Sequence, residues 1–120
     1  MKPNERDLTL VWDMLEATRE LVGFTAGMSR SDFASRRMAR LAVERLLQVI
    51  GEAASKTSIE LRQRHGELNW ADIIKMRHIL SHEYGEELLR RVHRAAFVKA
   101  PTYIPLLEAI FKEMTDQEQP

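Results

Sequence analysis

The sequence predicts an all-α protein, an antiparallel up-and-down helical bundle with one short extra helix and a last helix kinked by proline. Apolar residues recur at spacings of three and four along most of the chain, which is typical of amphipathic helices. No segment alternates between apolar and polar residues as a half-buried strand does, and no internal repeat is present. The length of 120 residues suits one domain, so we expect a single helical domain over residues 1–120.

The first two predicted helices carry different apolar patterns. The first is expected to end near Gly23 or at Gly27, because glycine favours helix ends. Its narrow face consists of Leu8, Val11, Leu15, Thr18 and Val22. Ser31 or Asp32 can cap the second helix. Its wide apolar band consists of Phe33, Ala39, Ala42, Val43, Leu46, Leu47, Ile50, Ala53 and Ala54. Such width predicts a helix that is central in the bundle or lies at a subunit interface.

A short extra helix is predicted after the second long helix. Ser58 provides its N-cap, since the hydroxyl can accept a hydrogen bond from a backbone N–H of the first turn. The helical turn runs through residues 59–62 and stops at Gly66. Asn69 provides the next cap in the same way, and a third long helix follows it.

The third long helix is predicted to run from Trp70 to about Tyr84 and to end at Gly85, which readily adopts the left-handed conformation. Alternating spacings of three and four place five residues on one stripe of this helix. They are Trp70, Ile73, Arg77, Leu80 and Tyr84. Arg77 therefore occupies a position where the pattern favours an apolar residue, and a charge there is costly without an anionic partner.

The last helix begins near Glu86. Its apolar residues are Leu88, Leu89, Val92, Ala96, Phe97, Leu106, Leu107, Ile110, Phe111 and Met114. Pro101 and Pro105 fall within this pattern and must bend or break the helix, because proline lacks an N–H and clashes with the preceding turn. Residues 115–120 are expected to form a frayed tail.

Composition argues against several classes of protein. Lysine and arginine number 18 together, as do aspartate and glutamate, so the formal net charge is zero and a large basic field that coats nucleic acid is not expected. The chain has no cysteine, which excludes disulfides and thiolate chemistry. No apolar run approaches the roughly 20 residues that span a bilayer, and the polar N-terminus is unlike a signal peptide. We therefore expect a cytoplasmic protein without membrane contact.

The end of the third long helix holds side chains suited to catalysis. Arg77 provides a fixed positive charge that matches phosphate, and His82 provides an imidazole that can move a proton near neutral pH. His78, Ser81 and Glu83 surround this pair as candidate supporting residues. These side chains are most of what metal-free cleavage of RNA requires.

Helix geometry limits how Arg77 and His82 can act together. They are five residues apart, so they lie roughly 140° apart around an ideal helix. One helix therefore does not aim both at a single small substrate. Either the arginine bends round, or the helix loosens before Gly85, or a second copy of the chain completes the site across a twofold axis.

Three interpretations fit these residues. In the first, which is structural, Arg77 pairs with a buried carboxylate such as Glu44 or Glu52. In the second, His78 and His82 bind a metal from successive turns, although no third ligand is evident. In the third, the protein is a ribonuclease that needs neither metal nor cofactor. His82 then moves the proton of the ribose 2′-hydroxyl or of the leaving oxygen, and Arg77 stabilises the charged phosphorane.

The motif Arg-x4-His-x-Tyr, formed by Arg77, His82 and Tyr84, resembles the signature of HEPN-domain ribonucleases, and of HepT-like toxins in particular. The resemblance covers roughly residues 5–114. Outside the motif it rests on Phe33 and on residues 38–44, 49–54, 70–77 and 103–107. A resemblance of this length implies a HEPN-like helical bundle.

Resemblance to this family also implies an activity and partners. HEPN ribonucleases are metal-independent endoribonucleases that act as homodimers, with two motifs lining a shared cleft. HepT-like proteins are toxins of type VII HepT/MntA toxin–antitoxin systems, and their antitoxin is an MntA-like nucleotidyltransferase that adenylylates the motif tyrosine. Arg77 and His82 would then be catalytic, RNA would be the substrate, and Tyr84 would be the AMP-modified residue. The alternative is a non-catalytic helical binding module that only docks the nucleotidyltransferase.

The chain departs from the family pattern at one position of the motif. Many relatives have glycine between the histidine and the tyrosine, whereas this chain has Glu83. A carboxylate there would favour positive charge on His82 or would repel RNA. Glu52 is expected to be structural, and Trp70 and Met76 are expected to pack in the core.

Overall fold

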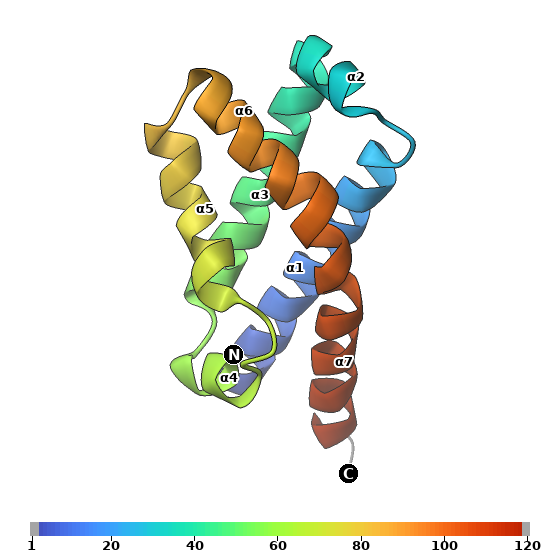
Figure 1. Cartoon of the computed structure of the whole chain (residues 1–120). Helices are drawn as coiled ribbons and strands as arrows, with labels where there is room; N and C mark the ends of the chain where they lie inside the picture. The colour runs from blue at the N-terminus through green and yellow to red at the C-terminus, as the bar shows by residue number, and fades with distance from the viewer. Residues whose placement is uncertain (1–2, 119–120) are drawn as a thin grey trace.

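The computed structural model describes residues 3–118 and confirms the all-α class (Figure 1). Its elements are α1 (Pro3–Thr25), α2 (Arg30–Ser35), α3 (Arg37–Lys56), α4 (Ile59–Arg64), α5 (Trp70–His82), α6 (Gly85–Arg94), the π-helical segment η1 (Ala95–Lys99) and α7 (Ala100–Glu118). Within this part of the chain there is no strand. The long helices run alternately up and down, and α4 is the predicted short extra helix (Figure 1).

The central position expected for the second long helix is confirmed. The most extensive helix contacts join α1 with α3, α1 with α7, and α3 with α5. The largest fully buried side chains are Phe33, Met14, Leu15, Leu21, Ile50, Leu68, Leu107 and Ile110. Burying an apolar side chain of this size stabilises the fold by about 1.5–3 kcal/mol. The core therefore holds α1, α3 and α7 together, and α5 packs against α3.

Three local features at the ends of helices agree with the sequence-based expectation. Ser58 Oγ accepts a hydrogen bond from the Leu61 N–H at 3.1 Å, and Asn69 Oδ1 accepts one from the Asp72 N–H at 3.2 Å. Gly85 has φ of +67°, the left-handed conformation expected after the third long helix. Such features depend on a few neighbouring residues, which is why the sequence alone predicts them.

The start of the second helix differs from the prediction. Ser29 is the cap, in place of Ser31 or Asp32: its hydroxyl accepts from the Asp32 N–H at 3.0 Å, and the Asp32 carboxylate accepts from the Ser29 N–H at 3.3 Å. Hydrogen bonds from the Ser29 backbone and hydroxyl lower the pKa of Asp32. The helix is then interrupted at Arg36, which is extended with φ −103° and ψ 95°. One predicted helix is therefore two, α2 and α3.

A buried carboxylate joins the N-terminal helix to α4. Asp7 accepts hydrogen bonds from the Ser58 N–H at 2.9 Å and from the Ser58 hydroxyl at 2.6 Å. The two residues are 51 positions apart, so no local pattern predicts this contact. Both carboxylate oxygens have a donor, which offsets the cost of burying the charge.

The last helix bends without breaking. α6, η1 and α7 follow one another directly, and Figure 1 shows the change of direction between α6 and α7. The proline ring clashes with the carbonyl four residues earlier, which for Pro101 is that of Phe97 inside η1. The wider π-helical turn accommodates this clash, so the helix continues past Pro101. Pro105 lies inside α7, which continues to Glu118. The expected fraying from Thr115 is wrong as far as Glu118, and residues 119–120 lie outside the described part.

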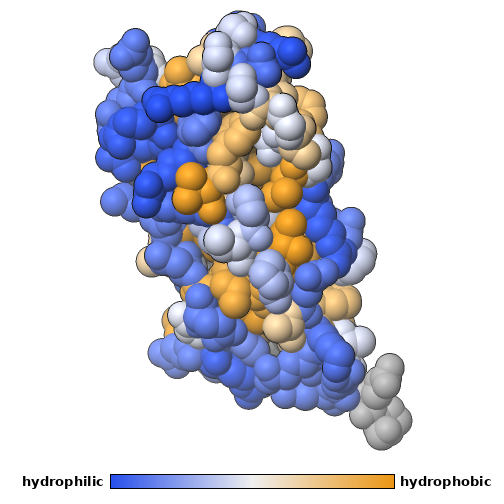
Figure 2. Space-filling view, turned by 45° about the vertical axis from the view of Figure 1, so that its right-hand side comes forward, coloured by the Kyte–Doolittle hydropathy of each residue, from blue (hydrophilic) through white to orange (hydrophobic). Residues whose placement is uncertain are grey.

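Figure 2 views the side on which α7 lies and shows apolar side chains in a broken run between polar flanks. Exposed large apolar residues of the molecule include Trp12, Phe24 and Val98. Trp12 packs against Phe111 of α7 with ring centroids 5.0 Å apart. None of the helices between residues 3 and 118 is long and apolar enough to cross a membrane.

Candidate active site

The face of α5 that enters the core differs from the predicted stripe. Its buried residues are Trp70, Ile73, Met76 and Ile79. Trp70 and Met76 are core residues, as expected, but Arg77 is exposed and Tyr84 is 85% exposed. The predicted stripe is therefore not the buried face of α5, and α5 ends before Tyr84. Apolar residues occur around most of α5, so periodicity alone does not determine which side meets α3.

Arg77 extends along the surface of α3. Its Nη1 donates a hydrogen bond to Ser55 Oγ at 3.0 Å, and its Cγ passes directly over Gly51. Throughout residues 3–118, no carboxylate forms an ion pair with this guanidinium. The expected structural pairing with Glu44 or Glu52 is therefore absent. Ser55 was not predicted from the sequence, and Gly51 entered only within the segment 49–54 that resembles the family, although a glycine inside a helix indicates close packing.

An open hollow between α3 and α5 contains Arg77. Its lining consists of Gln48, Glu52, Ile74, Lys75, Arg77, His78 and Ser81. Glu52 accepts a hydrogen bond from Gln48 Nε2 at 3.4 Å, and Ser81 Oγ donates to the Arg77 carbonyl at 3.0 Å. Arg77 and Lys75 bring fixed positive charge to the hollow, and Glu52 partly offsets it. This arrangement suits a phosphate group approached from solvent.

The two histidines of α5 lie against each other. The ring centroids of His78 and His82 are 4.1 Å apart, and the planes are tilted by 41°. Both residues are exposed. In the described chain, no group of three or more His, Asp or Glu side chains comes together in a way that could hold a metal ion.

Within one chain, Arg77 and His82 do not line the same hollow. His78 and Arg77 both line the hollow. His82 lies outside it, with its ring packed against the ring of His78. α5 remains helical through His82, so the helix does not loosen between the two residues. A loosening of α5 therefore does not bring Arg77 and His82 to one small substrate.

Glu83, the departure from the family motif, points toward α6. Its Oε1 lies 3.0 Å from Arg91 Nε, which also contacts Glu87 Oε1 at 3.1 Å. Hydrogen bonds from Arg90 and then Arg91 lower the pKa of Glu87. Glu83 Oε2 is buried without a hydrogen-bond partner among residues 3–118. The negative charge next to His82 is thus balanced by an arginine that the sequence analysis did not single out.

Tyr84 projects into solvent from an extended link. α5 ends at His82, two residues earlier than expected, and Tyr84 has φ −154° and ψ 175° immediately before α6. With 85% of its surface exposed, its hydroxyl is accessible to an enzyme. The positive φ of Gly85 then turns the chain into α6.

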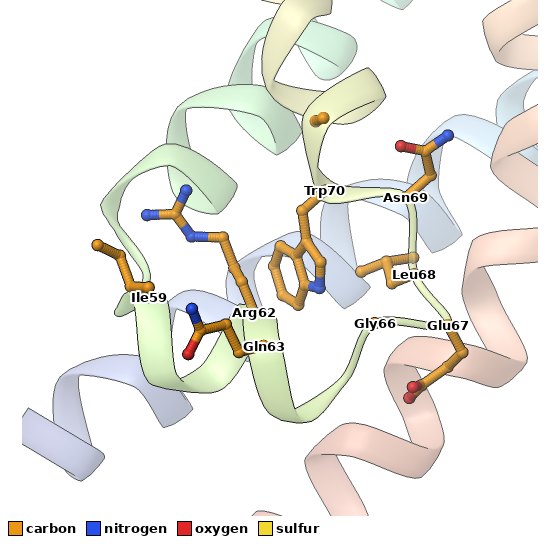
Figure 3. A pocket seen from close by; sticks show the side chains of 9 residues that line it. Ile59, Arg62, Gln63, Gly66, Glu67, Leu68, Asn69 and Trp70 are labelled. Carbon is orange, nitrogen blue, oxygen red and sulfur yellow. The ribbon is translucent and has the colours of Figure 1, made fainter.

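A second hollow lies between α4 and the start of α5 (Figure 3). Trp70 Nε1 donates to the His65 carbonyl at 2.9 Å, and Arg62 Nη2 donates to the Thr57 carbonyl at 2.9 Å. Arg62 Nε is buried without a hydrogen-bond partner among residues 3–118. No residue of the motif lines this hollow. The candidate active site is therefore the hollow between α3 and α5.

Comparison with known proteins adds independent information. The family model described as Ribonuclease HepT-like matches residues 14–110. A protein of Methanocaldococcus jannaschii named as a candidate RNase is 30% identical over 82 residues, which are 68% of this chain and 75% of that protein. Another from the same organism is 27% identical over 116 residues, 96% of each chain. A protein of Thermococcus cleftensis named probable ribonuclease HepT is 31% identical over 84 residues, 70% of this chain and 74% of that protein. No solved structure matches the chain significantly.

Proposed function

Because the chain belongs to the HepT-like ribonuclease family, we propose that it is the toxin of a type VII HepT/MntA toxin–antitoxin system. It acts in the cytoplasm as a metal-independent endoribonuclease. One observation carries the assignment of the site. Arg77 is exposed at an open hollow and donates to the Ser55 hydroxyl, and no carboxylate in the described chain forms an ion pair with it.

The chemistry assigned to the site is internal transfer of a phosphate ester. The ribose 2′-oxygen attacks phosphorus, the bond to the 5′-oxygen breaks, and the products carry a 2′,3′-cyclic phosphate and a 5′-hydroxyl. His82 takes the proton of the 2′-hydroxyl or gives one to the leaving 5′-oxygen. Arg77 stabilises the negative charge of the phosphorane. His78 and Ser81 support this pair, since His78 packs on His82 and Ser81 bonds to the Arg77 carbonyl.

The active unit is a homodimer in this proposal. Met38 is 74% exposed and Leu41 is 40% exposed on α3. Spacings of three and four place both on the helix face that also carries Gln48 and Ser55. Apolar contact there would bring a second motif next to the hollow, and exposed residues of this kind are typical of interfaces.

Mixed dimers test whether the site is shared. Arg77→Ala and His82→Ala chains are inactive alone, but a mixed dimer retains one site with both groups if each site takes arginine from one chain and histidine from the other. We expect each mixed dimer to cleave at about half of the wild-type rate, which is about a quarter for the whole sample when the chains pair at random. If dimers form and remain inactive, each site lies within one chain.

Neutralisation is assigned to an MntA-like nucleotidyltransferase that adenylylates Tyr84. The exposure of this side chain supports the assignment. AMP adds bulk and a negative phosphodiester next to the motif, where it competes with the phosphate of RNA for the positive charge. Mass spectrometry after coexpression with the partner should find AMP on Tyr84, and Tyr84→Phe should escape neutralisation. A fully neutralised protein with unmodified Tyr84 would overturn this assignment.

Cleavage of cellular RNA in excess EDTA tests the catalytic proposal. Wild type should cleave, His82→Ala should lose about 10²–10⁴-fold, and Arg77→Ala should lose about 10²–10³-fold. Arg90→Ala is a matched control, because Arg90 is an exposed arginine bonded only to Glu87 among residues 3–118. Cleavage that disappears with chelator, or persists in both variants, excludes the proposal. Absence of cleavage together with a stable nucleotidyltransferase complex would instead identify a non-catalytic binding module.

A further inference from the structure

Gly51 lies on α3 directly beside the backbone of α5 and the stem of Arg77. A Cβ atom added at Gly51 would lie 2.9 Å from Arg77 Cγ, 3.0 Å from the Ile73 carbonyl oxygen and 3.5 Å from Arg77 Cδ. Contacts this short force neighbouring atoms to move. The Ile73 oxygen belongs to the backbone of α5, and Arg77 Cγ is near the root of its side chain, so neither moves freely. Only glycine fits this position with Arg77 in its observed place.

Ser55 holds the other end of the same side chain. It lies one turn after Gly51 on the same face of α3. The Ser55 hydroxyl donates its proton to the Glu52 carbonyl at 2.7 Å, which leaves its lone pairs free to accept from Arg77 Nη1 at 3.0 Å. The hydroxyl is thus oriented as an acceptor before any ligand arrives.

An uncharged acceptor orients the guanidinium of Arg77 without neutralising its charge, whereas a carboxylate would do both. A carboxylate partner would fix the guanidinium but would cancel its positive charge and compete with phosphate. The Ser55 hydroxyl takes one of five N–H donors and leaves the charge in place. Because Ser55 already orders the Arg77 side chain in the free protein, binding of RNA costs less conformational entropy at this residue.

From these contacts we infer that Gly51 and Ser55 are positioning residues for Arg77, a role that rests on the proposed ribonuclease function. Gly51 sets the path of the aliphatic stem, and Ser55 sets the orientation of the guanidinium. Together they hold the charge on the α3 side of the hollow, where a bound phosphate meets it without rearrangement.

Four single substitutions test this role through cleavage kinetics. Ser55→Ala should lower kcat/KM for RNA cleavage about tenfold, as expected for loss of one preorganised hydrogen bond. Ser55→Thr retains the hydroxyl and should remain within about threefold of wild type. Gly51→Ala should lower kcat/KM more than Ser55→Ala, because the added methyl displaces the arginine itself. Gly23→Ala is the matched control, since a Cβ there meets nothing within 4 Å inside α1.

Combination with Arg77→Ala separates positioning from a general loss of structure. In the Arg77→Ala background, Ser55→Ala and Gly51→Ala should cause no further loss of cleavage, because the group they position is gone. Further loss of the same size in this background would mean that the two residues act independently of Arg77 and would overturn the inference.

The order of the Arg77 side chain, measured by NMR relaxation of its guanidinium nitrogens, gives a readout without RNA. Order should fall in Ser55→Ala and stay near wild type in Ser55→Thr and Gly23→Ala. Unchanged order in Ser55→Ala overturns the inference even if cleavage changes. If order falls as expected but wild type cleaves no RNA, the positioning stands and the proposed function fails.

Discussion

Two arginines near the α5–α6 connection have opposite surroundings. Arg91 shares its Nε between the carboxylates of Glu83 and Glu87, at 3.0 and 3.1 Å. Arg77 donates to the hydroxyl of Ser55, and no carboxylate of the described chain pairs with it. The charge of Arg91 is therefore neutralised by carboxylates of the same chain, whereas the charge of Arg77 remains available to a ligand. The partner of an arginine, more than its position along a helix, indicates which role it has.

Replacing each arginine by alanine should produce the largest contrast. Arg77→Ala should lower RNA cleavage about 10²–10³-fold, with a change in the free energy of unfolding below about 0.5 kcal/mol. Arg91→Ala should leave cleavage within about threefold and lower the free energy of unfolding by about 1 kcal/mol, since exposed ion pairs contribute little. Cleavage assays and urea denaturation measure both. Equal loss of cleavage in the two variants would remove the distinction.

Replacement by lysine should sharpen the same contrast. Arg77→Lys keeps the charge but loses the planar donors that bind phosphate and Ser55 together, so cleavage should fall about tenfold or more. Arg91→Lys should change cleavage less than about twofold, because a point charge still balances both carboxylates. Parallel kcat/KM measurements at one salt concentration test this. Full activity of Arg77→Lys would show that charge alone suffices.

Glu83→Gln should affect stability modestly. The substitution removes one of the two carboxylates paired with Arg91, so the free energy of unfolding should fall by about 1 kcal/mol or less. The loss should shrink in high salt, because salt screens exposed ion pairs. Thermal unfolding at low and high salt measures it. A stability loss that is independent of salt would mean that the carboxylate acts through packing or hydrogen bonding.

The smallest predicted effect concerns a histidine whose surroundings differ from those of His82. His93 stacks on Phe97 with centroids 4.5 Å apart, and burial, followed by the charge of Arg30, lowers its pKa. The unfolded chain then binds a proton more readily than the folded one, so stability falls as pH drops below about 6.5 and is flat above it. His93→Gln should weaken this dependence, as thermal unfolding between pH 5 and pH 8 would show (about 1.5 units on either side of a histidine pKa). An unchanged slope would assign it to other groups.

The helix ends show what could be predicted from the sequence. Ser58, Asn69 and Gly85 act through residues within one turn, and their predicted roles agree with the structure. The break at Arg36 was missed, because the apolar pattern continues on both sides of it. The motif formed by Arg77, His82 and Tyr84 could also be recognised from the sequence, because it is defined by the order and spacing of these residues. Their functional roles stay predictions.

The surroundings of the motif could not be predicted in the same way. The side of α5 that meets α3 depends on packing between distant segments, and the stripe assigned to Arg77 was wrong for that reason. Arg91 as the partner of Glu83 and Ser55 as the partner of Arg77 are contacts between different helices. Gly51 inside α3 was a sign of close approach available in the sequence, because glycine destabilises a helix by about 0.5–1 kcal/mol relative to alanine.

The bond between Asp7 and Ser58 has a bearing on the order in which the protein assembles. α4 has six residues, too few to persist alone in water, and its cap is fixed by a side chain 51 positions earlier. We therefore expect α4 to form only after α1 lies against α3, as a late step of folding. Trp70 bonds to the carbonyl at the end of α4, so its fluorescence should report that step.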